Sequence, residues 1–330
     1  MDFRTKIDIS QSNIDVNHKD QLMIFGSCFA ENIGELLKQN KFSTNINPFG
    51  ILYNPESIRQ ALEIVISEKQ FTGDDLFQYG GLYNSFYHHS RFSNQDRDQC
   101  IHQINENIKQ AHDDLSRTKI LFITFGTSYV YQLKETGLIV GNCHKIPANK
   151  FDRYKLKAEQ ITSEWDILIN KLKNVSPDMQ IIFTVSPIRH FKDGAHENQL
   201  SKSTLLLAVD ELCSVNTNTS YFPSYEIVLD ELRDYRFYND DMIHPNNTAI
   251  KYIWEKFGET YFSDSTREII NEWKKLQTAI QHRPFNPNTD EHKHFLKQTL
   301  LRLKSFKNKY PYICCCKEEE SLAHQTNPID

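Results

Sequence analysis

The chain lacks the features that mark exported, membrane-spanning and nucleic-acid-binding proteins. Its seven cysteines are an odd number without paired spacings, so a disulfide framework is not expected. The start of the chain lacks the apolar core of a signal peptide, and no apolar run approaches the length of a membrane span. A net charge of -5 at pH 7 gives no positive footprint for nucleic acid. These absences predict a cytoplasmic protein without a membrane or nucleic-acid partner.

Several common catalytic and cofactor motifs are also missing. Phe25 stands where the Gly-x-Ser-x-Gly elbow of the α/β-hydrolases needs its first glycine. There is no Walker A loop, dinucleotide fingerprint or His-Glu-x-x-His zinc signature, and no internal repeat. The sequence therefore predicts no cofactor and no metal. Its 330 residues are enough for one large domain with an appendage.

A strand-to-helix turn near the N-terminus supplies the first candidate catalytic residue. Residues 22–25 are apolar and predict a buried strand, and residues 29–37 change to helical periodicity. Gly26 permits a tight turn, which puts Ser27 at the helix N-terminus, where unpaired N–H groups favour developing negative charge. That position suits a nucleophile of acyl transfer. The alternative is that Ser27 only caps the helix.

The second candidate is an Asp-x-x-His motif, which occurs three times. The copy at 15–18 precedes the first predicted strand, whereas the copy at 193–196 follows a later strand and competes for the role. Asp241 and His244 are best placed, because Pro245 follows them and begins a helix after a loop. The Asp241 carboxylate can accept from Nδ1–H of His244 and leave Nε2 to take a serine proton. The alternative is a turn-capping Asp beside a surface His.

The stretch Gly-Ser-Cys-Phe-Ala at 26–30 is the signature that gives the GSCFA domain family its name. The chain resembles that family over roughly residues 20–260, and the order of its motifs makes the resemblance more specific than any one motif. The resemblance implies membership of the SGNH/GDSL hydrolase superfamily. The other resembling stretches are 47–50, 125–128, 142–145, 186–190 and 235–245.

Most of the catalytic elements that the resemblance implies can be placed on this sequence. In that superfamily a Ser follows the first strand, a Gly the second, Gly-x-Asn the third and Asp-x-x-His the last. Ser27, Gly50 and the pair Asp241 and His244 fit this order. The resemblance therefore implies that these residues form the catalytic triad and part of the oxyanion hole.

The third element departs from the superfamily pattern. Ser128 stands where an asparagine is expected, so the side-chain amide that usually donates to the oxyanion is missing at this position. The expected oxyanion hole comprises Ser27, Gly50 and a donor from Thr127 or Ser128. Asn142 is a further candidate for the missing amide donor.

These residues predict a serine hydrolase that acts on an acyl ester, such as an acylated carbohydrate, through a Ser-His-Asp triad and an acyl-enzyme. An acyltransferase with the same triad and a non-catalytic ligand-binding module on the same fold are the alternatives. The expected partner is a small-molecule or glycan acyl ester, and homo-oligomer formation stays open. A third possibility is that Cys28 is the nucleophile, although we expect its side chain to pack behind the turn.

A substrate pocket is indicated by the family motifs and by a histidine- and aromatic-rich excursion at 69–97. Positive charge there would hold an anionic substrate group, whereas the alternative for Arg189 and Lys145 is a fixed ion pair between loops. The aromatic side chains either line the cleft or pin the excursion to the body. The expected pocket residues are His89, Asn142, His144, Lys145, Arg189 and His190.

Short apolar runs alternate with longer amphipathic stretches, which is typical of a parallel sheet covered on both faces. We expect an α/β fold: a doubly wound three-layer α/β/α sandwich with a mostly parallel five-stranded sheet, plus a C-terminal helical extension. The resemblance implies that this sandwich is flavodoxin-like and of SGNH hydrolase type. The motifs fall after strands, where such sheets bind ligands. The expected strands are 22–25, 42–46, 120–125, 181–185 and 220–229, and the expected helices are 29–39, 55–67, 98–115, 154–174 and 202–214.

The chain is expected to divide into three parts. Residues 1–262 form the catalytic domain, 263–308 form helices packed on it, and 309–330 form a disordered tail. The tail carries three adjacent cysteines at 314–316 and His324. Because three adjacent side chains do not easily converge on one ion, we expect incidental thiols and not a metal site.

Overall fold

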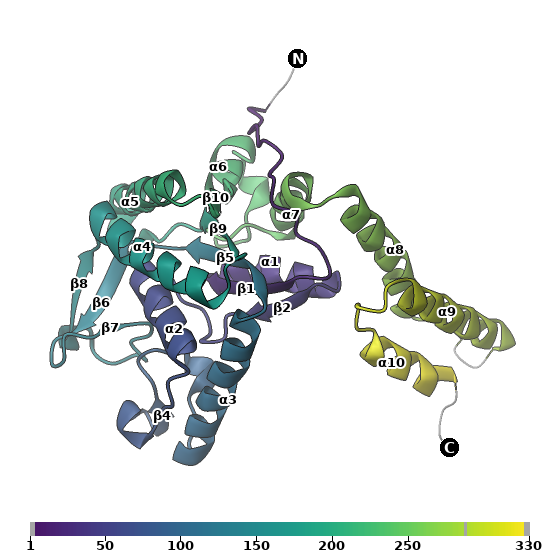
Figure 1. Ribbon diagram of the computed structural model, residues 1–330, viewed down its shortest axis with the longest axis horizontal. Coiled ribbons are helices and arrows are strands. Elements are labelled where there is room, and N and C mark those ends of the chain that lie inside the picture. The colour runs from purple at the N-terminus through teal and green to yellow at the C-terminus, as the bar shows by residue number, and fades with distance from the viewer. Residues whose placement is uncertain (1–3, 287–288, 327–330) are drawn as a thin grey trace.

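The computed structural model describes residues 4–286 and 289–326 and is built around a five-stranded sheet (Figure 1). All neighbouring strands in this sheet are parallel. Their order, β10-β9-β5-β1-β2, is the flavodoxin-like order of a doubly wound fold, which confirms the predicted fold class. The strands are β1 (Gln21–Gly26), β2 (Ser43–Ile46), β5 (Thr118–Phe125), β9 (Gln180–Val185) and β10 (Thr219–Tyr221).

Helices cover both faces of the sheet and enclose two separate cores. They are α1 (Cys28–Gln39), α2 (Pro55–Ser67), α3 (Arg97–Leu115), α4 (Ala158–Val175), α5 (Gly194–Val215) and α7 (Asn247–Tyr261). In β1, Met23 and Phe25 join a core with α2, α3, α4 and α5, whereas Leu22 and Ile24 join a core with α1 and α7. This alternation follows from the two-residue repeat of a strand and produces the three layers.

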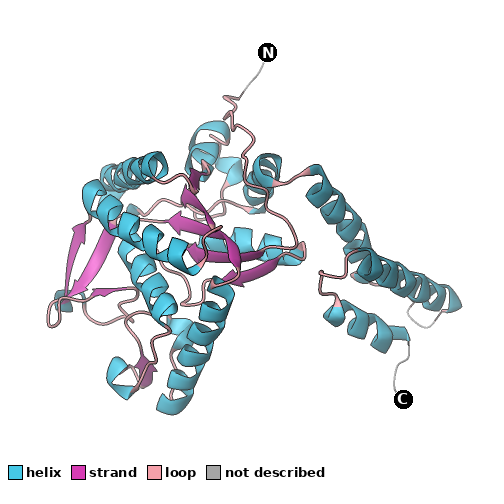
Figure 2. Cartoon of the chain, in the orientation of Figure 1, coloured by secondary structure: helices cyan, strands magenta, loops and turns pink. Residues whose placement is uncertain are grey.

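Two small antiparallel sheets lie outside the central sheet (Figure 2). The excursion at 69–97 contains the hairpin of β3 (Phe77–Tyr79) and β4 (Leu82–Asn84). A second sheet, of order β7-β6-β8, was not predicted; it comprises β6 (Tyr129–Leu133), β7 (Ile139–Val140) and β8 (Phe151–Lys155). Short 3-10 turns occupy Gly73–Asp75, Ser90–Phe92, Ala148–Lys150, Phe191–Asp193 and Tyr235–Phe237.

Three predicted element boundaries were wrong. The helix expected over 202–214 begins eight residues earlier, at Gly194. The last strand was expected over 220–229 but ends at Tyr221, because Pro223 interrupts it and the chain then turns into α6 (Ser224–Glu226) and a π-helical turn (Ile227–Glu231). The helix expected over 154–174 begins only at Ala158, since the preceding residues pair with β6.

The C-terminal extension forms a helical arm beside the body (Figure 1). It comprises α8 (Asp264–Ile280), α9 (Asp290–Lys309) and α10 (Cys316–Thr326), which share a core of their own. Trp273 Nε1 donates to the carbonyl of Gln39 at 2.8 Å, and Lys41 pairs with Glu318 at 2.6 Å, so the arm is bonded to the end of α1.

The prediction of a disordered tail over 309–330 is corrected by helix α10, which reaches Thr326. Its Leu322 is buried in the core of the arm, so apolar packing orders a segment whose polar composition suggested disorder. Residues 327–330 lie outside the described residues. None of the described helices combines the length and the apolar character needed to cross a bilayer.

Candidate active site

Ser27 occupies the turn between β1 and α1 without acting as a side-chain cap. Gly26 has φ +143°, and a Cβ at this position would lie 2.4 Å from the carbonyl oxygen of Thr124, so only glycine fits the turn. Ser27 is the N-cap residue of α1, yet its hydroxyl makes no capping hydrogen bond. The Oγ atom is buried and has no partner among the described residues. This geometry removes the alternative in which Ser27 only caps the helix.

Asp241 accepts three hydrogen bonds, two from His244 and one from its neighbour Ile243. Asp241 Oδ2 lies 2.6 Å from His244 Nδ1, and Oδ1 accepts from the backbone N–H groups of Ile243 and His244, each at 2.9 Å. These backbone and side-chain bonds from His244 and Ile243 lower the pKa of Asp241 to about 2. Because the carboxylate stays ionised and faces Nδ1, Nε2 of His244 is the nitrogen left to accept a proton.

Ser27 and His244 line the same cavity, whose volume is about 610 Å³. The two residues are more than two hundred positions apart in the sequence, and the parallel sheet brings their loops to one rim. No hydrogen bond between Ser27 Oγ and His244 Nε2 is present in the described structure. Catalytic hydrogen bonds of this kind commonly tighten only when substrate binds, so the shared cavity is the relevant observation.

The competing Asp-x-x-His copies are engaged elsewhere. Asp193 forms a bidentate ion pair with Arg153, with both N–O distances 2.5 Å, so its carboxylate is not free to orient His196. His18 is buried, stacks on Phe42 at 4.0 Å, and its Nε2 is 2.9 Å from the carbonyl of Asn40. Of the three copies, only that of Asp241 and His244 has, among the described residues, an imidazole that is bound to its carboxylate and lines the cavity.

The amides expected to complete the oxyanion hole are already used by the fold. The N–H of Gly50 donates to the main-chain carbonyl of Asn47 at 2.7 Å, and the N–H of Thr127 donates to the carbonyl of Tyr53 at 3.0 Å. The Ser128 N–H donates to Ser201 Oγ at 2.8 Å. Of the residues expected in the hole, Ser27 and Thr127 line the cavity. The loops after β2 and β5 are therefore held in place by amides that the sequence pattern assigned to the oxyanion.

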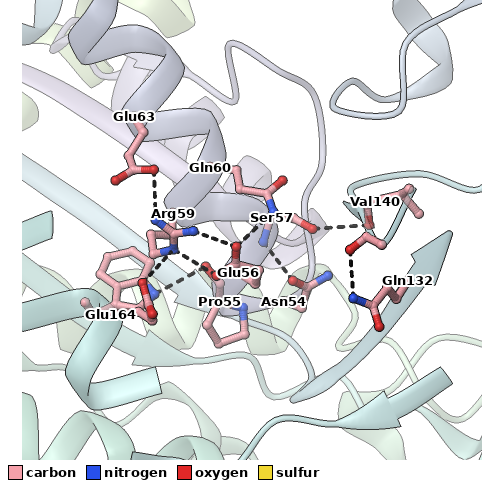
Figure 3. Close-up of polar contacts among 12 residues, drawn as sticks. Asn54, Pro55, Glu56, Ser57, Arg59, Gln60, Glu63, Gln132, Val140 and Glu164 are labelled. Atoms are coloured by element: carbon pink, nitrogen blue, oxygen red, sulfur yellow. Dashed lines mark hydrogen bonds and ion pairs between the residues drawn. The ribbon is translucent and has the colours of Figure 1, made fainter. Parts of the chain in front are cut away.

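Two side-chain amides at the cavity are better placed to donate. Asn54 was not among the predicted site residues, but it lines the cavity and is fixed at the start of α2, where its Oδ1 accepts from the Ser57 N–H at 2.8 Å (Figure 3). Asn142 also lines the cavity, and its Oδ1 accepts from the N–H of His144 at 2.8 Å. In both cases the oxygen is occupied, which leaves the NH₂ group without a hydrogen-bond acceptor among the described residues. The Asn-Pro step before α2 was the signal for Asn54.

The predicted pocket residues divide into two groups. His89, Asn142, Arg189 and His190 line the cavity. His144 and Lys145 do not: His144 Nε2 is 2.8 Å from the carbonyl of Ser85, and Lys145 is exposed in a left-handed turn with φ 62°.

The three histidines predicted for the pocket, His89, His144 and His190, do not supply the positive charge that the sequence suggested. Burial lowers the pKa of His190 to about 4, and it also lowers the pKa values of His89 and His144. These imidazoles are therefore neutral near pH 7. Neither Arg189 nor Lys145 forms an ion pair with a described residue, so the alternative of a fixed ion pair between loops is not what the structure contains.

Lys202 of α5 is a buried cation that the sequence analysis missed. Its Nζ donates to the carbonyls of Gly126 at 2.7 Å and Ser186 at 2.6 Å, the residues that follow β5 and β9. The side chain is fully buried, and this burial lowers the pKa of Lys202 to about 7. Lys202 thus ties together the ends of two strands whose loops carry Thr127 and Arg189.

The cysteines offer weaker candidates for chemistry. Cys28 lines the cavity, but burial raises its pKa, which opposes formation of a thiolate nucleophile. Cys315 is buried, whereas Cys314 and Cys316 are exposed with Sγ atoms 3.5 Å apart. Within the described residues, no group of three or more His, Cys, Asp or Glu side chains is arranged to hold a metal ion. The side chain of His324 lies outside the described residues.

Comparison with known families agrees with the ordered motifs. The model of the GSCFA family matches residues 21–257, and that of the GSCFA domain protein, C-terminal domain, matches residues 273–328. A search of the curated proteins returned no match. The first match runs from β1 into α7 and includes Ser27, Asp241 and His244, while the second covers most of the helical arm. The chain belongs to the GSCFA family.

Proposed function

We propose that this protein is a serine hydrolase of the SGNH/GDSL type that cleaves an acyl ester, with Ser27, His244 and Asp241 as its catalytic triad. One observation carries the proposal: a buried hydroxyl without a partner and a carboxylate-bound imidazole line the same cavity. A buried hydroxyl left unpaired costs free energy, and this arrangement is common where function requires it.

The proposed reaction proceeds through an acyl-enzyme. Ser27 Oγ attacks the acyl carbonyl while His244 Nε2 takes the hydroxyl proton, and Asp241 stabilises the resulting imidazolium. The tetrahedral intermediate then collapses: the ester C–O bond breaks, and the alcohol leaves with the proton from His244. Water attacks the acyl-enzyme with the same base and releases the carboxylic acid and free Ser27.

The N-terminus of α1 and two side-chain amides are the proposed oxyanion donors. The first helical bond of α1 runs from the Glu31 N–H to the Ser27 carbonyl, so the N–H groups before Glu31 lie at the positive end of the helix. The amides of Asn54 and Asn142 border the same cavity. In this proposal, Asn54 or Asn142 replaces the asparagine that the superfamily has after its third strand.

Covalent labelling with a fluorophosphonate tests the proposal. The wild-type protein should be labelled at Ser27 and should hydrolyse short p-nitrophenyl esters. Ser27→Ala should lose both activities, with a fall in kcat of about 10⁵-fold or more, and His244→Ala should be labelled only weakly. The control Ser67→Ala changes an exposed serine on α2 and should react like wild type. Absence of labelling and of hydrolysis in the folded wild-type protein would refute the proposal.

Two alternatives share the same site. Transfer of the acyl group to an alcohol in place of water makes the protein an acyltransferase, and product analysis with and without an added alcohol separates the two reactions. A non-catalytic binding module is favoured by one observation, the engagement of the Gly50, Thr127 and Ser128 amides. Such a module would bind esters in the cavity without turnover. Cytoplasmic location stays a prediction from sequence.

A further inference from the structure

The cavity of Ser27 and His244 has a charge opposite to that of the whole chain. Arg153, Arg189 and Lys192 line it, and no Asp or Glu of the described residues does. In the full sequence, by contrast, 43 acidic residues outnumber 38 Lys and Arg. A concave site lined by charges of one sign raises the local concentration of ligands of the opposite sign.

The charge of Arg153 is already compensated, whereas that of Lys192 is not. Arg153 donates to both carboxylate oxygens of Asp193 and stacks over the ring of Tyr129 at 4.0 Å. Lys192 Nζ donates to the Tyr131 hydroxyl at 2.6 Å, which is a neutral acceptor. The positive charge of Lys192 therefore remains available at the cavity.

Arg189 is the least satisfied cation at this site. It makes no hydrogen bond or ion pair with the described residues, and its Nε is buried without an acceptor. Three carboxylates are bound to cavity residues, and all are occupied: Asp193 by Arg153, Asp241 by His244, and Glu197 by Tyr129 and Lys155. The guanidinium lies 4.8 Å from the ring centroid of Phe191, so stacking orients its plane and leaves its donors free. A buried donor without an acceptor points to a ligand that supplies one.

We infer that Arg189, assisted by Lys192, binds an anionic group of the substrate, so that the esters cleaved here carry a carboxylate or a phosphate. This inference rests on the proposed function for its ester chemistry. The planar guanidinium presents paired N–H donors that match two oxygens of such a group, and Lys192 adds a second positive charge. The ring of Tyr53 beside the cavity provides apolar surface for the rest of the molecule.

Three aryl acetates that differ in their para substituent test the inference. They are 4-acetoxybenzoate, 4-acetoxyphenyl phosphate and, as the neutral reference, 4-acetoxybenzamide. After correction for their rates of hydroxide hydrolysis, wild-type kcat/KM should favour at least one anionic ester by about 10- to 100-fold, as a charge-assisted contact typically gives. The two anionic arms distinguish a carboxylate from a phosphate site.

Variants assign this preference to its residues. Arg189→Met should remove most of it through a higher KM at similar kcat, because the contact is made equally in the ground and transition states. Arg189→Lys keeps the charge without the planar fork and should retain part of the preference, and Lys192→Met should lose a few-fold. The matched control Arg233→Met removes an exposed arginine of the surface and should leave the preference unchanged. Thermal melting shows which variants are folded, and Lys192→Met still tests the site if Arg189→Met does not fold.

A binding measurement separates failure of this inference from failure of the proposed function. Ser27→Ala is titrated with 4-acetoxybenzoate and with 4-acetoxybenzamide by calorimetry, with and without Arg189→Met. Cleavage of all three esters at corrected rates that Arg189→Met and Lys192→Met do not change overturns the inference and leaves the hydrolase intact. If no ester is cleaved and Ser27 is not labelled, the hydrolase is refuted, and Arg189-dependent binding of the carboxylate then still identifies an anion site.

Discussion

Arg59 and Arg189 are two partly buried guanidinium groups in one molecule, and their surroundings are opposite. Arg59 on α2 contacts three carboxylates, those of Glu56 at 2.7 Å, Glu63 at 2.8 Å and Glu164 at 3.7 Å (Figure 3). These acids, led by the hydrogen bonds to Glu56, raise the pKa of Arg59. Arg189 has no carboxylate within ion-pair distance among the described residues and leaves Nε buried without an acceptor.

The charge of Arg59 is paired with acids of the fold, whereas the charge of Arg189 has no such partner among the described residues. Each nitrogen of the Arg59 guanidinium faces a carboxylate oxygen, so this arginine is explained by its role in joining α2 to α4. Around Ser27 and Arg189 the fold leaves a hydroxyl and a guanidinium nitrogen without partners. Because such groups are costly when buried, their concentration in one cavity favours a site that a substrate completes.

The largest effect is expected at Asp241. Its carboxylate is bonded to His244, whereas Ser27 Oγ and Arg189 Nε in the same cavity have no partner among the described residues. Asp241→Asn removes the charged acceptor of Nδ1–H and permits the wrong imidazole tautomer, so kcat should fall by about 10³- to 10⁴-fold, as in comparable triads. Steady-state hydrolysis of p-nitrophenyl acetate measures the fall. Since the pKa of Asp241 is about 2, its carboxylate is ionised in the whole assay range, and acid inhibition above about pH 4 is not expected to arise from it.

Asp230→Asn is the matched control, because Asp230 pairs with Arg233 on the exposed surface. It should leave kcat within about two-fold of wild type, as expected for an exposed ion pair. Equal activity of Asp241→Asn and wild type would show that His244 is not oriented by this carboxylate. The triad assignment would then lose its third member.

The next largest effect is expected at Lys202, because its buried Nζ donates to two carbonyls next to the cavity. Lys202→Met keeps the length of the side chain but leaves the carbonyls of Gly126 and Ser186 without their donor. Two buried acceptors without partners should lower the free energy of unfolding by about 2–4 kcal/mol. Urea unfolding of both proteins measures the loss, and Lys251→Met on the exposed side of α7 is the control expected to lose less than about 0.5 kcal/mol.

The pH dependence of that loss has a definite sign. Burial lowers the pKa of Lys202 to about 7 in the folded protein, below its ordinary value of 10.5, so between these values the unfolded chain binds a proton that the folded chain does not. The contribution of Lys202 to stability should therefore grow from about pH 7 toward pH 10, by at most roughly 1.4 kcal/mol per pH unit. A difference between wild type and Lys202→Met that stays flat from pH 7 to 9.5 contradicts the lowered pKa.

Local sequence signals were sufficient for the sheet and for the positions of the residues of the proposed triad. The apolar run before Gly26 and the helical period after it place Ser27, and the short spacing of Asp241 and His244 lets them bond within one loop. The lack of an ion-pair partner for Arg189 among the described residues could not be predicted from local sequence signals. Whether an arginine forms an ion pair depends on which acids from distant parts of the sequence the fold brings to it. Asp193 is four residues from Arg189 in the sequence, yet it pairs with Arg153, forty residues earlier.

Contacts to main-chain atoms were the second obstacle to prediction from sequence. Lys202 bonds carbonyls that lie 76 and 16 residues away, and any residue type can present a carbonyl, so no side-chain pattern marks the contact. The same holds for the amide of Thr127, which bonds the carbonyl of Tyr53. The oxyanion pattern could assign this amide to a ligand, but only the folded loops show that it is engaged.

Arg59→Met tests the arginine that is paired within the fold, and it should lower the free energy of unfolding less than Lys202→Met does. It removes the one cation that three partly exposed carboxylates share, so we expect a loss of about 1–2 kcal/mol in the free energy of unfolding. Urea unfolding at low and high salt measures it, and the loss should shrink with salt. The preference for anionic esters should not change. A changed preference would mean that the Arg59 cluster also acts on the cavity.

The smallest effect is expected at Lys145, a cation near the cavity that does not line it. Lys145→Ala should leave kcat/KM for 4-acetoxybenzoate within about two-fold of wild type, because an exposed charge is screened over about 10 Å at 0.1 M salt. Lys145→Gly should in addition raise stability by about 0.5–1 kcal/mol, since glycine accepts its φ of 62° without a Cβ penalty. Thermal melting and the ester assay measure both. A loss of preference as large as that of Arg189→Met would mean that anions are selected by the general field of the loop, and the distinction between paired and unpaired arginines would then carry no information about the substrate.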